Sequence, residues 1–465
     1  MKKQITACGD WVLDRLSMDK VWNQHMAHYY APKNFNFWYF FGSLALLVLV
    51  NQIVTGIFLT MNYKPDAKLA FDSVEYIMRD VPWGWLIRYM HSTGASAFFI
   101  VVYLHMFRGI MYGSFKQPRE LIWIFGMLIF FALMAEAFTG YLLPWGQMSY
   151  WGAQVIISLF SAIPVIGDDL SLWIRGDFVV ADATLNRFFA FHVIAVPLVI
   201  LLLVFLHIVA LHEVGSNNPD GIEIKKNKDK NGIPFDGIPF HPYYSVKDLV
   251  GVGVFLFFFA AIIFYTPDMG GYFLEHDNFI PADPLKTPEH IAPVWYFTPY
   301  YAILRAVPDK FAGVIAMGAA VFVLCLLPWL DRSPVKSIRY RGGIYKKALF
   351  LFVISFLALG YLGTQPATTG AILVTRIFTV IYFGFFLLMP IYTRWEKVKE
   401  VPERLIEQPS IEDRIPAIIE TFDEMTVRKP IKTANGDTVV KLRPNLTGIG
   451  SVLIRFLKKL KASLD

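Results

Sequence analysis

Cysteine and charge are both scarce in this sequence. Two cysteines among 465 residues exclude an iron–sulfur cluster or a cysteine zinc site built by this chain alone. Neither Cys8 nor Cys325 lies in a C-x-x-C-H motif, so no haem is attached covalently. Charged residues make up 17% of the chain, whereas soluble domains carry roughly 25%. Together with 55% hydrophobic residues, this composition indicates a membrane protein with several spans.

The net charge gives no indication of nucleic-acid binding. A formal charge of +6 at pH 7 fits basic surfaces that face anionic lipid instead. Residues 1–35 carry charges throughout and lack a signal-peptide pattern.

Eight apolar segments are long enough to cross a bilayer as helices, which takes about 20 residues each. Charges are nearly absent within them, and proline and glycine gather between them. The fold class predicted is therefore an all-α membrane protein with eight transmembrane helices. The segments are 37–61, 89–112, 121–143, 188–210, 249–266, 311–330, 347–363 and 370–392.

Lys and Arg are unevenly distributed over the loops, and this predicts the orientation. One set of alternate loops holds 18 of them and the other set holds 9. Basic loops face the cytoplasm, so the first set and both termini are expected to be cytoplasmic. The outer loops 144–187 and 266–310 are long, which favours a functional role and surface helices there. The basic set is 1–35, 113–120, 211–247 and 331–347.

The tail, residues 396–465, has a soluble composition and ends in a predicted amphipathic helix. Its apolar stripe has helical spacing and is surrounded by basic residues. Such a helix could lie on the membrane surface or pack against a partner subunit, and the sequence favours neither. The stripe is Ile449, Val452, Leu453, Phe456, Leu457 and Leu460, and the basic residues are Arg455, Lys458, Lys459 and Lys461.

Four histidines lie inside two of the predicted spans, where ionisable residues usually serve function. His91 and His105 are 14 residues apart, which turns about 40° short of four full helical turns and rises about 21 Å. His192 and His207 are 15 apart, about 60° past four turns. By the topology, His91 and His192 lie near the outer face, and His105 and His207 near the inner face. Each cross-helix pair can supply two axial nitrogens to one haem iron, which favours electron transfer. Hydrogen-bonded core histidines are the alternative.

Glycines and arginines accompany the histidine pairs. Gly42 and Gly56 share the 14-residue period in the first span, as do Gly126 and Gly140 in the third. They would leave flat gaps beside each porphyrin, although small residues also serve helix packing. Two arginines stand where haem propionates would emerge, unless they extend toward the interface as ordinary boundary residues. They are Arg88 and Arg108.

Several strings resemble cytochrome b of the respiratory cytochrome bc complexes, over about residues 20–395. They begin with Gly140-Tyr-Leu-Leu-Pro-Trp-Gly-Gln-Met-Ser-Tyr-Trp-Gly152 and Arg187-Phe-Phe-Ala-Phe-His192. The next are His212-Glu-Val-Gly-Ser-Asn-Asn-Pro219 and Phe240-His-Pro-Tyr-Tyr-Ser-Val-Lys-Asp248. The last are Pro293-Val-Trp-Tyr296 and Ala302-Ile-Leu-Arg305.

The resemblance implies a Q cycle with two non-covalent b haems. Quinol would be oxidised at the outer face and quinone reduced at the inner face, with net proton translocation. The partners implied are a Rieske iron–sulfur protein, a membrane cytochrome c subunit and a second copy of the complex. The chain would be the core subunit of a quinol–cytochrome c oxidoreductase in a bacterial inner membrane, active only with those partners.

The resemblance also implies residues for two quinone sites. At the inner site, His212 and Asp248 are expected to donate protons, with Ser216 beside them, and Lys247 could hold a proton path or an anionic lipid headgroup. Tyr296 is expected to act at the outer site. The other outer quinone-binding candidates are Phe138, Tyr141, Met148, Gly152, Pro293 and Tyr301.

Two positions depart from the family pattern. The 15-residue spacing of the fourth-span histidines is that of chloroplast-type relatives, while the string from His212 is of the mitochondrial kind. The second departure is Val294, which stands where the family usually has a proton-accepting Glu in Pro-Glu-Trp-Tyr. Glu136, four residues before Gly140 and in the outer half of its span, is the candidate replacement base. A structural carboxylate that bonds a neighbouring helix is the alternative.

The expected organisation has four parts. Residues 1–36 form a cytoplasmic segment, 37–215 a four-helix bundle around two haems, 216–395 a four-span region with the outer quinol loop, and 396–465 the tail. Another quinone-linked dehydrogenase with a di-haem b anchor would also explain the histidines, but not eight spans or the Pro-Val-Trp-Tyr loop. A transporter or channel would explain only the hydrophobicity.

Overall fold

The structure is a computed structural model that describes residues 11, 15, 28–405, 431–432 and 438–439. The chain divides into two units, 1–404 and 405–465. In the second unit, β3 (Ile431–Lys432) pairs antiparallel with β4 (Thr438–Val439). The predicted amphipathic helix at 449–460 lies outside the described residues.

Eight helices in the described residues are long and apolar enough to cross a membrane, which confirms the eight predicted spans. A bilayer core offers no water to backbone groups, so these segments satisfy their N–H and C=O groups internally as helices. The spans are η2 (Phe37–Tyr39) with α3 (Phe40–Thr60); α5 (Gly84–Tyr112); α6 (Glu120–Leu142); α9 (Asp182–Ala190), η3 (Phe191–Ala195) and α10 (Val196–Val214); η5 (Phe240–Tyr244) with α11 (Ser245–Tyr265); α13 (Lys310–Phe322), η8 (Val323–Leu326) and α14 (Leu327–Leu330); α15 (Gly343–Gly363); and α16 (Thr369–Leu387).

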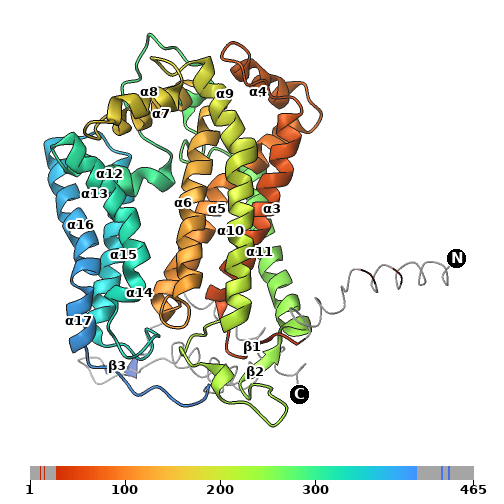
Figure 1. Ribbon diagram of the computed structural model, residues 1–465, viewed down its shortest axis with the longest axis vertical. Coiled ribbons are helices and arrows are strands. Elements are labelled where there is room, and N and C mark those ends of the chain that lie inside the picture. Colours follow the sequence, from red (N-terminus) through yellow and green to blue (C-terminus); the bar gives the residue numbers. More distant parts are fainter. Residues whose placement is uncertain (1–10, 12–14, 16–27, 406–430, 433–437, 440–465) are drawn as a thin grey trace. The chain divides into compact units, whose positions relative to one another are not determined.

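Surface helices occupy the predicted outer loops. In Figure 1, α4, α7 and α8 lie across the upper end of the molecule, above the spans. The remaining elements are α4 (Ala70–Arg79), α7 (Gln147–Phe160), α8 (Gly167–Arg175), η4 (Ile224–Lys226), η6 (His276–Phe279), η7 (Trp295–Phe297), α12 (Thr298–Ala306) and α17 (Met389–Trp395), with β1 (Tyr30–Pro32) paired antiparallel to β2 (Gly237–Pro239).

The spans form two groups. In the first, α3 packs on α5 and α10 on α6, while α11 flanks α3 and α5. In the second, α13, α15 and α16 surround α12 (Figure 1). The fifth span thus packs with the first four rather than with the last three.

Buried polar side chains join the two groups through an aromatic core. The Trp123 indole N–H donates to the Leu324 carbonyl at 2.8 Å, and the Tyr345 hydroxyl donates to the Ile110 carbonyl at 3.0 Å. The Tyr103 hydroxyl donates to the backbone carbonyl of Tyr296 at 2.7 Å. The first two bonds join α6 to η8 and α15 to α5, and the third fixes the position of η7, which carries the Trp-Tyr end of the Pro-Val-Trp-Tyr string.

The fourth span contains a π-helical turn at Phe191–Ala195, where the Val196 N–H donates to the Phe191 carbonyl. A π-turn accommodates one extra residue in an α-helix. The turn includes His192, so it absorbs the extra residue in the 15-residue spacing to His207. The departure from the 14-residue spacing therefore leaves both rings on one face of the helix.

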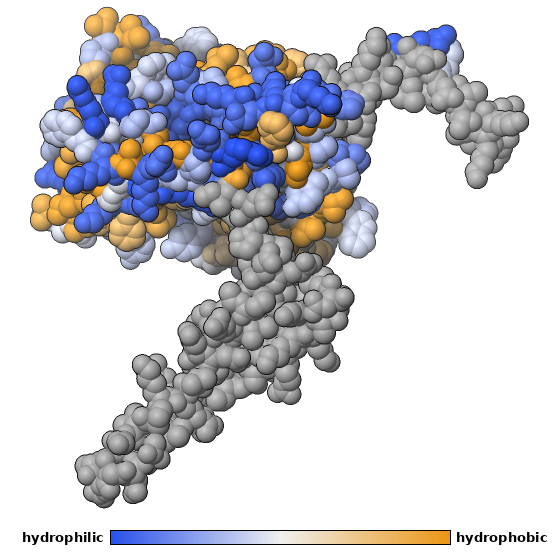
Figure 2. Space-filling view, turned by 90° about the horizontal axis from the view of Figure 1, so that it is seen from below, coloured by the Kyte–Doolittle hydropathy of each residue, from blue (hydrophilic) through white to orange (hydrophobic). Residues whose placement is uncertain are grey.

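Charged side chains concentrate at the lower end. Figure 2 views this end and shows hydrophilic side chains gathered across it. Arg341 is 1% exposed and bonds Asp331 and Glu396, the latter at 3.0 Å. Lys116, between α5 and α6, also pairs with Asp331 at 3.3 Å. This network ties the first group of helices to the second.

Candidate functional site

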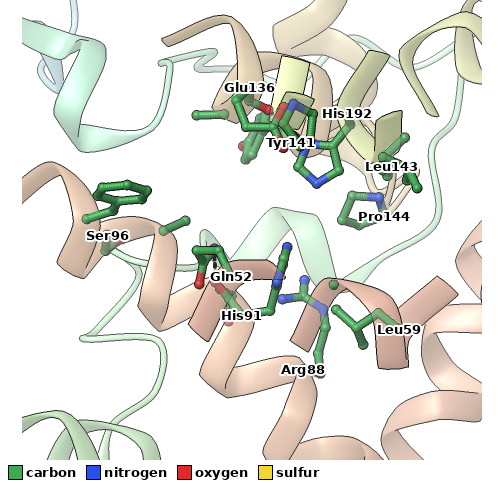
Figure 3. Close-up of a pocket in the computed structure, with 18 of the residues that line it drawn as sticks. Gln52, Leu59, Arg88, His91, Ser96, Glu136, Tyr141, Leu143, Pro144 and His192 are labelled. Carbon is green, nitrogen blue, oxygen red and sulfur yellow. Dashed lines mark hydrogen bonds and ion pairs between the residues drawn. The ribbon is translucent and has the colours of Figure 1, made fainter. Parts of the chain in front are cut away.

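The outer pair of histidines faces across one cavity. His91 on α5 and His192 on η3 have ring centroids 6.1 Å apart, with the ring planes 86° to each other. An iron about 2 Å from each nitrogen would separate the two centroids by about 6 Å. Figure 3 shows the two rings on opposite walls, so the geometry fits bis-histidine ligation.

Hydrogen bonds set the tautomers of this pair. The Thr55 hydroxyl donates to the Asn51 carbonyl at 2.6 Å and therefore accepts from His91 Nδ1 at 2.9 Å. The Glu136 carbonyl, which can only accept, lies 3.0 Å from His192 Nδ1. With the protons on Nδ1, both Nε2 lone pairs are free for a metal, as second-shell bonds to metal-binding histidines usually arrange.

The inner pair has similar spacing. His105 and His207 have ring centroids 6.4 Å apart at 59°. Arg108 lies 3.1 Å from His105 Nδ1, with its guanidinium over the Tyr39 ring. A guanidinium can only donate, so ligation through Nε2, with the proton on Nδ1, requires Arg108 to leave Nδ1.

Each predicted glycine lies against one of the four histidines. A Cβ at Gly140 would stand 2.3 Å from His192 Cε1, so no side chain fits there. The corresponding distances at the other three are 3.2–3.4 Å. The glycines therefore make room for the rings themselves. The pairs are Gly42 with His105, Gly56 with His91, Gly126 with His207 and Gly140 with His192.

The outer cavity joins the histidine pair to predicted quinone residues. It has a volume of about 290 Å³ and is lined mainly by apolar side chains. The structure brings Arg88, Glu136, Tyr141 and Tyr296 to its walls, together with Val294. An apolar cavity with a few polar groups suits a ring-shaped ligand with an apolar tail.

Glu136 contacts an axial-ligand candidate directly. Its Oε1 lies 3.1 Å from His192 Nδ1, the nitrogen that its own backbone carbonyl also faces. Its Oε2 is buried without a hydrogen-bond partner in the described residues. The carboxylate therefore lines the cavity and holds the ring at the same time.

Other outer candidates lie outside the cavity wall. Phe138 packs against Phe188 with ring centroids 5.3 Å apart. Met148 is buried, and the Arg305 guanidinium lies 4.6 Å from the Tyr301 ring centre. A Cβ at Gly152 would stand 3.4 Å from the Tyr141 ring, and Pro293 is half-buried beside Val294, so these two are neighbours of the wall.

Three of the four inner quinone candidates contact residues that flank β1. The Tyr29 ring stacks on His212 with centroids 4.5 Å apart, and its hydroxyl lies 3.0 Å from Ser216 Oγ. Lys247 donates to the Phe35 carbonyl at 2.9 Å. Asp248 lies in the first turn of α11, which begins at Ser245 rather than at the predicted 249. The sequence around Phe240–Tyr244 is polar and aromatic and predicted a loop, whereas the structure has a π-helical turn with a kink at His241.

Sequence reasoning missed Thr55 and Glu275. Thr55 is a polar residue beside a periodic glycine in an apolar span, so that signal was available. Glu275 is one of several acidic residues in its loop, and nothing in the sequence distinguishes it.

The comparisons with known proteins agree on one family. Residues 26–215 match the family model described as Cytochrome b/b6/petB, and residues 281–383 match Cytochrome b(C-terminal)/b6/petD. The chain is 64% identical over 413 residues to a cytochrome b of Allochromatium vinosum, covering 87% of this chain and 100% of that one. It is 51% identical to a cytochrome b of Rhodospirillum rubrum, covering 84% and 94%.

A solved structure is similar over most of the chain. The structure, titled "Hyperthermophilic respiratory Complex III", matches with a TM-score of 0.77 at 42% identity, covering 83% of this chain and 99% of that chain.

Proposed function

Because the chain belongs to the cytochrome b family, we propose that it is the core subunit of a quinol–cytochrome c oxidoreductase of the respiratory Complex III type. It would oxidise quinol at the outer face, reduce quinone at the inner face and so contribute to proton translocation. The observation that carries the proposal is the pairing of four histidines across two helices, at 6.1 and 6.4 Å between ring centroids.

The residues that would hold two b haems are these four histidines. Bound haem iron supplies one-electron transfer, and two axial histidines leave it no open position for oxygen chemistry. Thr55 and the Glu136 carbonyl orient the outer rings. Arg88 and Arg108 are the cations that could pair with propionates.

The outer cavity is proposed to bind quinol. Val294 is buried in its wall and cannot accept a proton. Glu136 is the carboxylate on that wall, and we propose that it accepts a quinol proton while its contact with His192 holds the ring. Tyr296, stacked on Phe99 with centroids 3.9 Å apart, is proposed to shape the site. The neighbouring candidates, which do not line the cavity, would act behind the wall or in binding the tail. They are Phe138, Met148, Gly152, Pro293 and Tyr301.

The inner site is proposed to deliver protons to quinone. His212 and Ser216 lie on one side of Tyr29. Asp248 and Lys247 lie in the first turn of α11. A His and an Asp near a membrane boundary are suitable proton donors, and Lys247 could also bind an anionic headgroup.

The proposed assembly follows from the family to which the chain belongs. The chain has no iron–sulfur ligands, so we propose that a Rieske protein accepts one quinol electron at the outer face. That protein would pass the electron to a cytochrome c subunit. The complex is proposed to be a homodimer. We propose the bacterial inner membrane as its location, with cytoplasmic termini, the haem bundle at 37–215 and the quinol loop in 216–395.

Haem content tests this function. In the purified complex we expect two b haems per chain by haemochrome quantitation and a reduced-minus-oxidised spectrum. His91→Ala should remove the outer haem and His207→Ala the inner one. His276→Ala is the control, because that histidine is exposed in an outer loop. Unchanged haem content in His91→Ala would contradict the proposed ligation.

A further inference from the structure

A second carboxylate approaches the outer cavity from a different element. Glu275 lies in the loop between α11 and η7, directly before η6. The Tyr141 hydroxyl, at the outer end of α6, donates to Glu275 Oε2 at 3.0 Å. Tyr141 lines the cavity, and so do Phe273 and Leu274, the two residues before Glu275. Glu275 therefore stands behind the wall, connected to the cavity through one phenol.

The loop that carries Glu275 is fastened to α7. The Asn278 side chain accepts from the Ser149 N–H at 2.9 Å and donates to the Ser149 hydroxyl at 2.9 Å. The Gln147 N–H donates to the Ile280 carbonyl at 3.0 Å. Such anchoring holds a side chain in a fixed geometry, as proton transfer requires.

The surroundings of Glu275 favour a proton on its carboxyl group. Burial raises its pKa to about 7, although hydrogen bonds from its own backbone and from Tyr141 act in the opposite direction. The titratable groups that face it are the phenols of Tyr141 and Tyr296. No Lys, Arg or His forms an ion pair with it among the residues that the structure describes. A carboxyl group titrating near neutrality can both take up and release a proton.

We propose that Tyr141 and Glu275 form a proton outlet of the outer quinol site, with Glu275 acting through the Tyr141 phenol. This rests on the proposed function, and it assigns one of the two quinol protons. The Tyr141 oxygen takes a proton from the quinol hydroxyl while its own proton passes to Glu275 Oε2. The phenol ends neutral, and the carboxylate becomes a carboxylic acid that releases its proton on the outer side. The quinol electrons leave to the iron–sulfur partner and the outer haem.

This outlet explains why a valine is tolerated at position 294. The valine removes a proton acceptor from the wall formed by η7, whereas Tyr141 reaches the same cavity from α6. Glu136, which contacts His192, is the proposed acceptor of the other quinol proton, so the outlet supplies a second, separate acceptor.

The pH dependence of quinol oxidation tests the outlet in the assembled complex. A base must be ionised to accept a proton, so the wild-type rate should rise through about pH 7. In Glu275→Gln this rise should disappear, and the rate at pH 8 should fall about a hundredfold, which is at the low end for a general base. Tyr141→Phe should have the same effect, and Glu275→Asp should restore the rise. Glu289→Gln, the same change at an exposed glutamate of the same loop, should behave as wild type.

The rise in rate near pH 7 decides the outcome. If this rise persists in Glu275→Gln, or is absent from the wild type, the proposed outlet is wrong. The absolute rate does not decide this, because a residue that only packs would lower the rate without changing its pH dependence. Haem content measured on the same samples distinguishes failure of the proton outlet from failure of the proposed function. A wild-type complex with two b haems and quinol oxidation keeps the function even if the outlet fails.

Discussion

Two carboxylates at opposite ends of the molecule, Glu223 and Glu275, have opposite surroundings. At the inner end, burial opposes ionisation of Glu223, but the hydrogen bonds and charges of Arg119 and Lys336 outweigh it and lower the pKa to about 2. At the outer end, Glu275 is bonded by a phenol, and burial raises its pKa to about 7. Carboxylates held permanently as anions stabilise structure, whereas one that titrates near neutrality can exchange protons. The contrast separates a carboxylate that is held as an anion, Glu223, from one whose surroundings allow proton exchange, Glu275.

The largest effect is expected from Gly140→Ala at the outer end. The added methyl group would stand 2.3 Å from the His192 ring, so the ring must move away from Gly140 and out of its present position opposite His91. We expect loss of the outer haem with the inner haem retained, measured by haem quantitation and the reduced spectrum. Gly126→Ala, at 3.4 Å from His207, should retain more haem at the inner site. Gly318→Ala, which meets nothing within 4 Å, is the control. Full haem content in Gly140→Ala would show that the ring can yield without losing its ligand position.

The next effect concerns stability at the inner end. Asp331→Ala leaves the buried Arg341 with one partner fewer and removes the partner of Lys116. Breaking a buried ion pair costs about 3–5 kcal/mol. Thermal unfolding in detergent should show this loss, while Glu400→Ala, at an exposed position, should not. An unfolding temperature equal to that of the control would mean that the network contributes no net stability.

A smaller effect contrasts the two carboxylates through pH. The pKa of Glu223 is lowered from 4.5 to about 2, so its stabilisation is present above pH 4.5 and is lost as the pH falls toward 2. Glu223→Gln should therefore cost on the order of 2 kcal/mol at pH 7, and the difference should shrink in acid. The pKa of Glu275 is raised, so ionisation costs stability as the pH rises from 4.5 through 7.

Unfolding curves at several pH values measure both effects. The wild type should lose stability as the pH rises from 5 to 8, and Glu275→Gln should not show this loss. The wild type should also lose stability in acid as Glu223 is protonated, and Glu223→Gln should not show that loss. If both variants change stability in the same direction with pH, the contrast between the two ends is wrong.

Long-range pairing marks the limit of what the sequence predicts. The eight spans follow from apolar length, and the facing of the histidines follows from helical periods of 14 and 15 residues that keep each pair on one face. The π-turn at Phe191–Ala195 has no comparable signal, because it depends on packing that tolerates one extra residue. The bond between Tyr141 and Glu275 joins residues 134 apart, and only the folded loop brings them together. Periodicity therefore predicted which histidines face each other, whereas the contacts around them had to come from the structure.

The smallest effect is expected from an ion pair at the outer end. Arg79 and Glu75 on α4 form a 2.6 Å pair in which the arginine side chain is 74% exposed. Solvent screens such an i, i+4 pair, and it contributes about 0.3–0.5 kcal/mol at most. Arg79→Ala should therefore leave the unfolding temperature and the quinol oxidation rate close to those of the wild type. If Arg79→Ala lowered the unfolding temperature as much as Asp331→Ala, burial would not decide how much an ion pair stabilises the protein. The stability of the two ends would then depend on the number of charges at each end and not on their burial.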